Sequence, residues 1–217
     1  MSHDLRTPLT MIQAYAEMMR DIPGENTPEN VQVIIDEAGH LTGMVNDLLD
    51  ISKLQACVTQ LNKTHFNLTA NLEEAVQRIG RMASANEFMI ELICDHDKEV
   101  FVDADEFKIY QVVYNLINNA LNYSGDSRHV TVRQECIDDT VKVSVQDFGP
   151  GIAKENLPLV WERYYKVDKE HLRSFNGSGL GLAIVRKILE LHNAQYGVDS
   201  TLGQGSTFWF CLKVSDE

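Results

Sequence analysis

The first sixty residues carry apolar side chains at alternating spacings of three and four, and none of their segments alternates apolar and polar residues as a strand does. This spacing is that of a heptad seam, so we expect two long helices joined by a short loop. The segment Asp21–Gly24 breaks the pattern, and Thr27 is the expected N-cap of a second helix that begins at Pro28. The first stripe consists of Leu5, Leu9, Ile12 and Met19, and the second of Val31, Ile34, Ala38, Leu41, Val45 and Leu48.

Two such helices form an antiparallel hairpin, which we place at residues 1–62. A hairpin alone leaves apolar surface in contact with water, so it requires a partner. A four-helix bundle built by two chains is the economical arrangement, and it predicts a homodimer. The alternative is that the hairpin packs on another domain of its own chain.

A different pattern begins near Phe66, where short helices and strands follow one another to the end of the chain. The expected helices are Leu72–Met82, a segment from a cap at Asp103 or Asp105 to about Asn122, and Leu180–His192. The expected strands are Phe88–Cys94, Val100–Val102, Val130–Ile137, Val141–Val145, Tyr196–Thr201 and Ser206–Val214. Residues 66–217 therefore predict an α/β sandwich with helices on one face of a sheet, and the whole chain an α+β protein. Residues 168–178 lack periodicity and predict a mobile loop.

The overall charge limits the partners that the chain can bind. The net charge is −13 and the isoelectric point is near 4.9. Such a protein repels nucleic acids and anionic membranes, whereas a nucleotide needs only local backbone donors and a Mg²⁺ ion. The four cysteines lack a CxxC or zinc-type spacing, which indicates reduced thiols in a cytosolic protein. No run of about 18 apolar residues occurs, so we expect this segment neither to span a membrane nor to be exported.

A histidine beside a carboxylate lies near the start of the first helix. If Leu5 and Leu9 face the interior of the hairpin, His3 and Asp4 face solvent. The carboxylate can hold one ring nitrogen protonated, which leaves the lone pair of the other free to attack phosphorus. Thr7 lies one turn later and can position a water molecule near the same point. Alone, an exposed pair of this kind is also common surface decoration.

Three glycine clusters and two asparagines mark the second region. Asp147–Ile152 follows a strand, Gly177–Leu182 precedes a helix whose N–H groups suit phosphate, and Gly203–Thr207 lies near the end. Asn115 and Asn119 lie on one helix face, where neutral oxygens suit a Mg²⁺ ion that already carries phosphate. No strand leads directly into Gly177–Leu182 and no acidic residue follows about 20 positions later on a strand, so this cluster is not a dinucleotide-binding fingerprint. A GxxxxGK[ST] phosphate loop is also absent from the sequence, so a bound nucleotide requires a different set of contacts.

These motifs, in this order and spacing, resemble those of the sensor histidine kinases over essentially the whole chain. Ser2–Leu9 resembles their phosphoacceptor box, and Asn115–Tyr123 resembles their asparagine box. Asp147–Ile152 and Gly177–Leu182 resemble their two glycine boxes, and Trp161–Asp168 is similar to the aromatic box between those two. The resemblance implies an ATP-dependent protein-histidine kinase of a two-component system.

The resemblance also implies roles and partners for the first helix. It implies that His3 is phosphorylated, with Asp4 as its acid–base partner. Asp4 and Thr7 are implied to serve the reverse reaction, dephosphorylation of the response regulator. The implied partners are a second copy of the chain, the receiver domain of a response regulator and an upstream sensor region.

For the second region the resemblance implies a site for ATP and Mg²⁺. Asn119 is implied to coordinate Mg²⁺, Asn115 to support the phosphates, and Lys166 to reach them. Asp147 is implied to accept a hydrogen bond from the adenine amino group, with Thr207 nearby. The other implied ATP-binding positions are Asn122, Tyr123, Gly149, Gly151, Ile152, Tyr165, Gly177, Gly179, Leu180, Gly181 and Leu182.

Three features depart from the pattern of the family. Asn122 stands where the family usually has a lysine that contacts phosphate, and Trp161 stands where it usually has phenylalanine. The chain also begins two residues before His3, whereas the first helix of the family normally continues upstream. We therefore expect the cytoplasmic portion of a longer protein that is anchored in the cell membrane.

Two other functions stay open. One is another ATPase of the same nucleotide-binding fold, as in gyrase-type enzymes and heat-shock chaperones. The presence of Ser2–Leu9 speaks against this class, which lacks the histidine box. The other is a catalytically silent, nucleotide-binding signalling scaffold, for which Asn122 is the only hint.

Overall fold

A computed structural model shows the chain as two compact units, Met1–Gln55 and Ala56–Glu217. The described residues are 2–55, 60–83, 87–95, 99–163, 165 and 179–215. Two helices come first, and strands and helices of an α/β sheet follow, so the α+β organisation expected from the sequence is confirmed. The domain limits drawn at 1–62 and 66–217 remain predictions.

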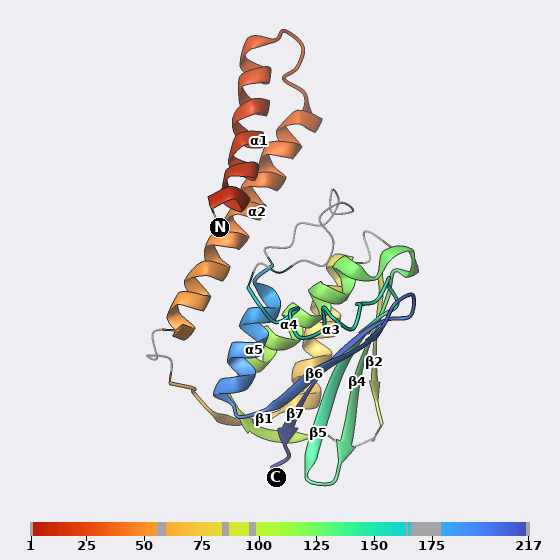
Figure 1. Ribbon diagram of the computed structural model, residues 1–217. Helices are drawn as coiled ribbons and strands as arrows, with labels where there is room; N and C mark the ends of the chain where they lie inside the picture. Colours follow the sequence, from red (N-terminus) through yellow and green to blue (C-terminus); the bar gives the residue numbers. More distant parts are fainter. Residues whose placement is uncertain are drawn as a thin grey trace. The chain divides into compact units, whose positions relative to one another are not determined.

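The first unit is a hairpin of two helices, α1 (Ser2–Asp21) and α2 (Pro28–Gln55), which lie side by side and antiparallel (Figure 1). The second helix begins where the sequence predicts. The backbone N–H of Asn30 donates to Oγ1 of Thr27 at 3.2 Å, so Thr27 caps the helix and Pro28 occupies its first position. Within the described part of the chain, no helix is long and apolar enough to cross a bilayer.

The apolar residues of α2 lie on two sides of the helix, and the seam expected from the sequence is only partly covered within one hairpin. Met44 is buried, and Ile34, Leu41 and Leu48 beside it are partly covered. A second stripe stays exposed because it lies about 90° or more from the first around the helix axis. Its members are Val31, Ile35, Ala38, Val45 and Leu49.

The first helix shows the same kind of difference. Leu9, assigned to the buried stripe from its spacing, is 56% exposed, whereas Pro8 beside it is buried. Leu5 and Ile12 are partly covered as expected. A helix that meets neighbours on two sides carries a broad apolar surface, so spacing alone does not separate the inner face from the outer one.

The second unit is built on a five-stranded sheet of order β2-β4-β5-β7-β6. Strand β2 runs parallel to β4, and the other neighbours are antiparallel. A separate ladder joins β1 to β3; the sequence did not predict β1. The bounds are β1 Thr64–Asn67, β2 Met89–Cys94, β3 Phe101–Ala104, β4 His129–Ile137, β5 Thr140–Asp147, β6 Gln195–Thr201 and β7 Gly205–Lys213.

Three helices cover one face of this sheet, as the sequence predicts (Figure 1). They are α3 (Leu68–Ala83), α4 (Glu106–Tyr123) and α5 (Gly181–Leu191). Asp105 caps α4 by accepting from the N–H of Lys108 at 3.1 Å, which settles the choice between the two aspartates. Helix α3 begins four residues before the expected start because the side chain of Asn67 accepts from the N–H of Ala70 at 3.0 Å. The core between helices and sheet includes Leu72, Leu116, Val143, Ile184 and Phe210.

Candidate functional site

A buried carboxylate ends strand β5. Asp147 is only 2% exposed, and its Oδ1 accepts from the backbone N–H of Gly149 at 2.9 Å. Burial raises the pKa of Asp147 to about 6, and hydrogen bonds from the backbone N–H groups of Gly149, Ser206 and Asp147 itself oppose that rise. At neutral pH the group is mainly an anion that accepts hydrogen bonds from inside the fold.

The loop that follows Asp147 is held so closely that it requires glycine. A side chain at Gly149 would begin 1.8 Å from the carbonyl oxygen of Tyr123, the last residue of α4. Gly151 has a φ of +71°, and a Cβ there would lie 2.1 Å from the carbonyl oxygen of Thr201. The loop is therefore clamped between the end of α4 and the end of β6.

The turn between β6 and β7 braces the same loop. The N–H of Gly203 donates to the carbonyl of Pro150 at 2.7 Å. The N–H of Ile152 donates to the side-chain oxygen of Ser200 at 2.8 Å. Ser200 also donates to the carbonyl of Gly205 at 2.8 Å. Two groups of one hairpin, the N–H of Gly203 and the hydroxyl of Ser200, thus hold the residues that follow Asp147 in place.

The neighbour of Asp147 on β7 is Ser206, and this corrects the expectation for Thr207. In the register of β5 and β7, Asp147 lies opposite Ser206, whereas Thr207 lies opposite Gln146. Because successive side chains of a strand point to opposite faces, Thr207 faces away from Asp147. The expectation was wrong because the pairing register, a long-range property, decides which of two adjacent hydroxyls shares a face with the carboxylate.

Helix α4 carries a stripe of amide side chains. Asn115, Asn119 and Asn122 are spaced by four and three residues and are all half-buried. The side-chain nitrogen of Asn115 donates to the carbonyl of Gln111 at 2.9 Å. No hydrogen bond to another described residue engages the amides of Asn119 and Asn122. These two amides therefore remain available to a ligand.

The start of α5 lies against this stripe. A Cβ at Gly181, the first residue of α5, would lie 3.1 Å from Oδ1 of Asn115. Gly179 has a φ of +70°, Leu180 is buried, and Leu182 is half-buried. The glycine that opens α5 thus brings its N-terminal N–H groups close to the amides of α4, an arrangement that favours an anion.

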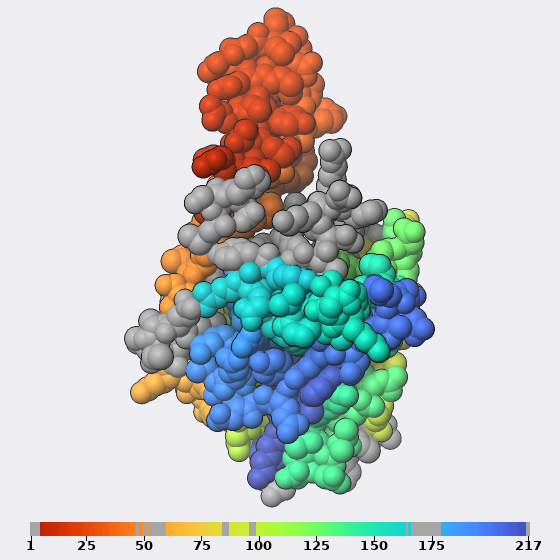
Figure 2. All heavy atoms as spheres, in the orientation of Figure 1, coloured from red at the N-terminus to blue at the C-terminus, as the bar shows by residue number. Residues whose placement is uncertain are grey.

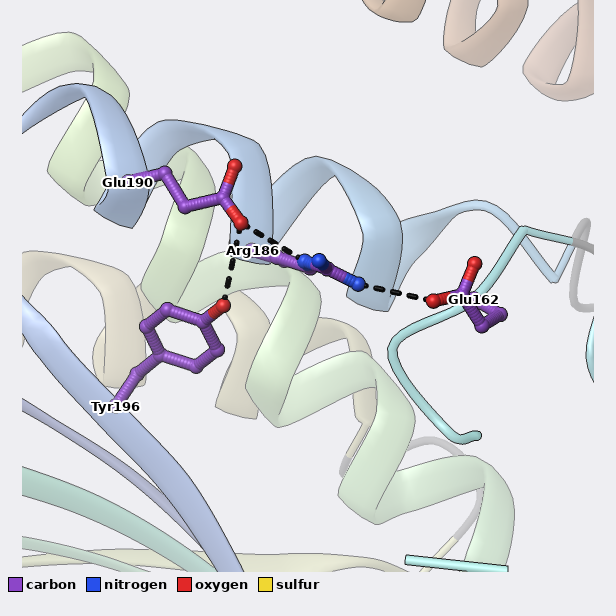
Figure 3. A network of polar contacts seen from close by, with 4 residues as sticks. All are labelled: Glu162, Arg186, Glu190 and Tyr196. Carbon is purple, nitrogen blue, oxygen red and sulfur yellow. Dashed lines mark hydrogen bonds and ion pairs between the residues drawn. The ribbon is translucent and has the colours of Figure 1, made fainter. Parts of the chain in front are cut away.

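One arginine ties the segment before α5 to α5 itself (Figure 3). Arg186 pairs with Glu162 at 3.0 Å and with Glu190 at 2.9 Å, and Tyr196 of β6 contacts Glu190. Trp161 packs edge-on against Tyr196 and Phe208. In the space-filling view, residues 150–163 form a cyan band beside α5 and the turn between β6 and β7 (Figure 2).

Comparison with known proteins places both units. Residues 1–57 match the model of the His Kinase A (phospho-acceptor) domain. Residues 104–216 match that of the histidine kinase-, DNA gyrase B- and HSP90-like ATPases. The chain belongs to the sensor histidine kinases.

Relatives and solved structures extend over the full chain. The sensor histidine kinase WalK of Bacillus subtilis is 34% identical over all of this chain, which spans 36% of the length of that relative. Full-length ShkA, solved with AMPPNP, matches the whole chain and 45% of its own at 26% identity and a TM-score of 0.74. ThkA in complex with the response regulator TrrA matches 99% of the chain and 60% of its own at 24% identity and a TM-score of 0.78, which supports the fold.

The kinase core brings many of the expected site residues together. Asn115 lies against Gly181, and Gly149 lies between Tyr123 and the carboxylate that ends β5. Gly151 and Ile152 contact Thr201 and Ser200 at the end of β6. Burial raises the pKa of the Tyr123 hydroxyl. Tyr165 is half-buried, and its N–H donates to the carbonyl of Glu162 at 3.4 Å.

Other expected residues of the kinase core cannot be placed in the same way. Lys166, Gly177 and the whole of the loop 168–178 lie outside the described residues. His3 and Asp4 lie in the first turn of α1, but the structure does not describe their side chains. Thr7, one turn later, is exposed. Sequence reasoning missed Ser200, Ser206 and Arg186. Ser206 lay within the last glycine cluster, but for Ser200 and Arg186 the sequence offered no comparable indication.

Proposed function

We propose that this kinase core binds Mg-ATP in its second unit and transfers the γ-phosphoryl group to His3. The observation that carries the proposal is Asp147, a buried anion at the end of β5. It lies beside a loop that requires glycine because other backbone segments pack closely against it. A buried anion that is stabilised only by backbone N–H groups is costly, so its retention indicates a ligand that donates to it. The amino group of adenine is such a donor.

Each element of the second unit has a part in holding the nucleotide. Asp147 accepts from the adenine amino group, and Gly149, Gly151 and Ile152 let the backbone approach the ring. The start of α5, with Gly179 and the buried Leu180, offers N–H groups to the phosphates. The positions expected from the sequence in the adjoining loop, Lys166 and Gly177, complete this part of the proposal.

The amides of α4 fit a magnesium ion that comes with the nucleotide. Among the described residues, no group of three or more histidine, cysteine or acidic side chains can hold a metal by itself. An ion bound mainly by phosphate and water needs only one or two neutral oxygens from the protein. Asn119, with a free half-buried amide, is the proposed ligand, and Asn115 and Asn122 lie beside it on the stripe. The ion, when bound, neutralises charge on the phosphates.

The transfer step uses residues of α1. The lone pair of one ring nitrogen of His3 attacks the γ-phosphorus, the N–P bond forms, and the bond to the bridging oxygen breaks, so that ADP leaves with that electron pair. Asp4 holds the proton on the other ring nitrogen. The phosphoryl group then passes to an aspartate of a response regulator, and Asp4 and Thr7 serve the dephosphorylation of that regulator.

The assembly around this core is also a proposal. The exposed stripe Val31–Leu49 on α2 pairs two copies of the chain in a four-helix bundle. The partner of the phosphorylated core is a receiver domain, and the whole protein is longer, with a sensor region and a membrane anchor. The described core itself lies in the cytoplasm, where ATP is supplied.

Titration of the chain with Mg-ATP tests the nucleotide site. The account predicts that ATP binds, that GTP binds more weakly, and that Asp147→Asn weakens ATP binding because an amide can present a donor where an acceptor is needed. Equal affinities for ATP and GTP in the parent protein would contradict the role of Asp147. Release of inorganic phosphate without labelled protein would indicate the ATPase alternative, and binding without either reaction would indicate a silent scaffold.

A further inference from the structure

Ser200, on β6, makes three polar contacts that together use the full capacity of its hydroxyl group. The oxygen accepts from the N–H of Ile152 at 2.8 Å, the hydroxyl donates to the carbonyl oxygen of Gly205 at 2.8 Å, and Oγ of Ser206 lies 3.0 Å away. A hydroxyl has one hydrogen and accepts at two positions. Ser200 therefore has neither a donor nor an acceptor left for anything else.

The single hydrogen of Ser200 determines the direction of the contact with Ser206. A carbonyl can only accept, so the single hydrogen of Ser200 goes to Gly205. The hydrogen between the two serines must then come from Ser206. Once that hydrogen is used, Ser206 can offer only lone pairs to any further neighbour.

Ser206 is placed where those lone pairs matter. It lies opposite Asp147 in the register of β5 and β7, and it is 5% exposed. Its backbone N–H also contributes to holding the carboxylate of Asp147. The two side chains share one face of the sheet, beside the loop that Ser200 holds through Ile152.

We propose that Ser200 is a specificity-determining positioning residue, which turns the hydroxyl of Ser206 so that Ser206 and Asp147 together present only acceptors to the base. This inference rests on the proposed nucleotide site. An adenine ring offers an amino group with two N–H donors at the recognised position, and guanine offers a carbonyl oxygen there. At that position, a surface of acceptors alone binds the amino group of adenine and repels the carbonyl oxygen of guanine.

The experiment compares Ser200→Ala with the parent protein by calorimetric titration with Mg²⁺ and non-hydrolysable analogues of ATP and GTP. Without Ser200, the hydroxyl of Ser206 can rotate and donate. The ratio of ATP to GTP affinity is expected to fall about three- to ten-fold, the effect of one neutral hydrogen bond. Ser200→Thr keeps the hydroxyl and is expected to restore the ratio.

Two further variants separate specificity from a merely structural role. Ser144→Ala makes the same change on the opposite face of β5, where Ser144 pairs with Trp209, and is expected to leave the ratio unchanged. In a Ser206→Ala background, Ser200→Ala is expected to have no further effect on the ratio, because Ser200 acts through Ser206.

Each outcome decides one question. If the parent protein does not prefer ATP, the proposed nucleotide site is wrong. If the parent prefers ATP but Ser200→Ala weakens both analogues equally, Ser200 only supports the loop and the inference is overturned. The inference is overturned as well if Ser200→Ala lowers the ratio to the same extent with and without Ser206. Should Ser200→Ala fail to fold, a ratio unchanged by Ser206→Ala alone overturns it.

Discussion

Asp147 is the residue at which stability and function oppose each other. Its carboxylate is enclosed by β5, β7 and the glycine loop, and burial raises its pKa to about 6 against an ordinary value of 3.8. A carboxyl whose pKa is higher in the folded than in the unfolded state binds more protons when folded. The free energy of unfolding therefore falls as the pH rises through this window, and the nucleotide-free protein carries a cost at neutral pH.

Replacement of Asp147 by asparagine is expected to remove that cost. The asparagine oxygen can still accept from the N–H of Gly149, but it carries no charge. At pH 8 the nucleotide-free variant should be more stable than the parent by about 1–3 kcal/mol, and at pH 5.5 the gain should be smaller, because there the parent is largely protonated. Thermal unfolding of both proteins at the two pH values measures the difference. A variant that is less stable than the parent at pH 8 would contradict the account.

Asn122 is one of the residues at which the chain departs from the pattern expected of its family. It lies on the amide stripe of α4, three residues after Asn119, and its side chain has no hydrogen bond to another described residue. A lysine there would add a charge-assisted contact to phosphate, worth about 1.5–3 kcal/mol. Asn122→Lys is therefore expected to tighten ATP binding by roughly ten-fold or more, as measured by calorimetry.

A charge on the surface in general would not have this effect. Gln77→Lys adds the same charge to the exposed face of α3 and serves as the control. If both variants bind ATP as the parent does, the positive charge is already supplied elsewhere, for example by Lys166. In that case Asn122 would not indicate a weakened kinase.

At the scale of elements, α2 carries two apolar faces with different expected roles. The covered face, with Leu41, packs within the hairpin, whereas Val45 on the other face is 44% exposed. Val45→Asp is expected to dissociate the dimer and leave the hairpin helical, because it puts a charge into an interface where each buried side chain contributes about 1.5–3 kcal/mol. Leu41→Asp is expected to unfold the hairpin as well. Light scattering and circular dichroism distinguish the two results.

The control for this pair is Asn46→Asp, which adds a negative charge at the next, exposed polar position of α2. It should leave both the dimer and the helix content unchanged. A dimer that survives Val45→Asp at the same protein concentration would show that the exposed stripe is not the interface.

Local chemistry allowed the elements to be predicted, and long-range pairing explains where the prediction failed. Thr27 and Pro28 mark the start of α2 because an N-cap is a property of neighbouring residues. Strand β1 has only four residues and exists because it pairs with β3, more than thirty positions away, so its own sequence does not announce it. The expectation for Thr207 failed for the same reason. A strand register or a packed helix face depends on partners that are distant in the sequence.

At the scale of the whole molecule, the proposed reaction is divided between two units. The proposed acceptor, His3, lies on α1 of the first unit, whereas Asp147 and the amide stripe of α4 belong to the second. A change in the acceptor should therefore abolish phosphorylation without weakening ATP binding. This separation is what distinguishes a histidine kinase from an ATPase that acts within one domain.

Incubation with ATP labelled at the γ-phosphate, followed by acid and alkali treatment of the protein, tests this account most directly. The parent protein and the control His65→Gln, an exposed histidine of the second unit, should acquire label that survives alkali and is lost in acid. His3→Gln should remain unlabelled and bind ATP with the affinity of the parent. Label with the same acid sensitivity on His3→Gln would contradict the central claim.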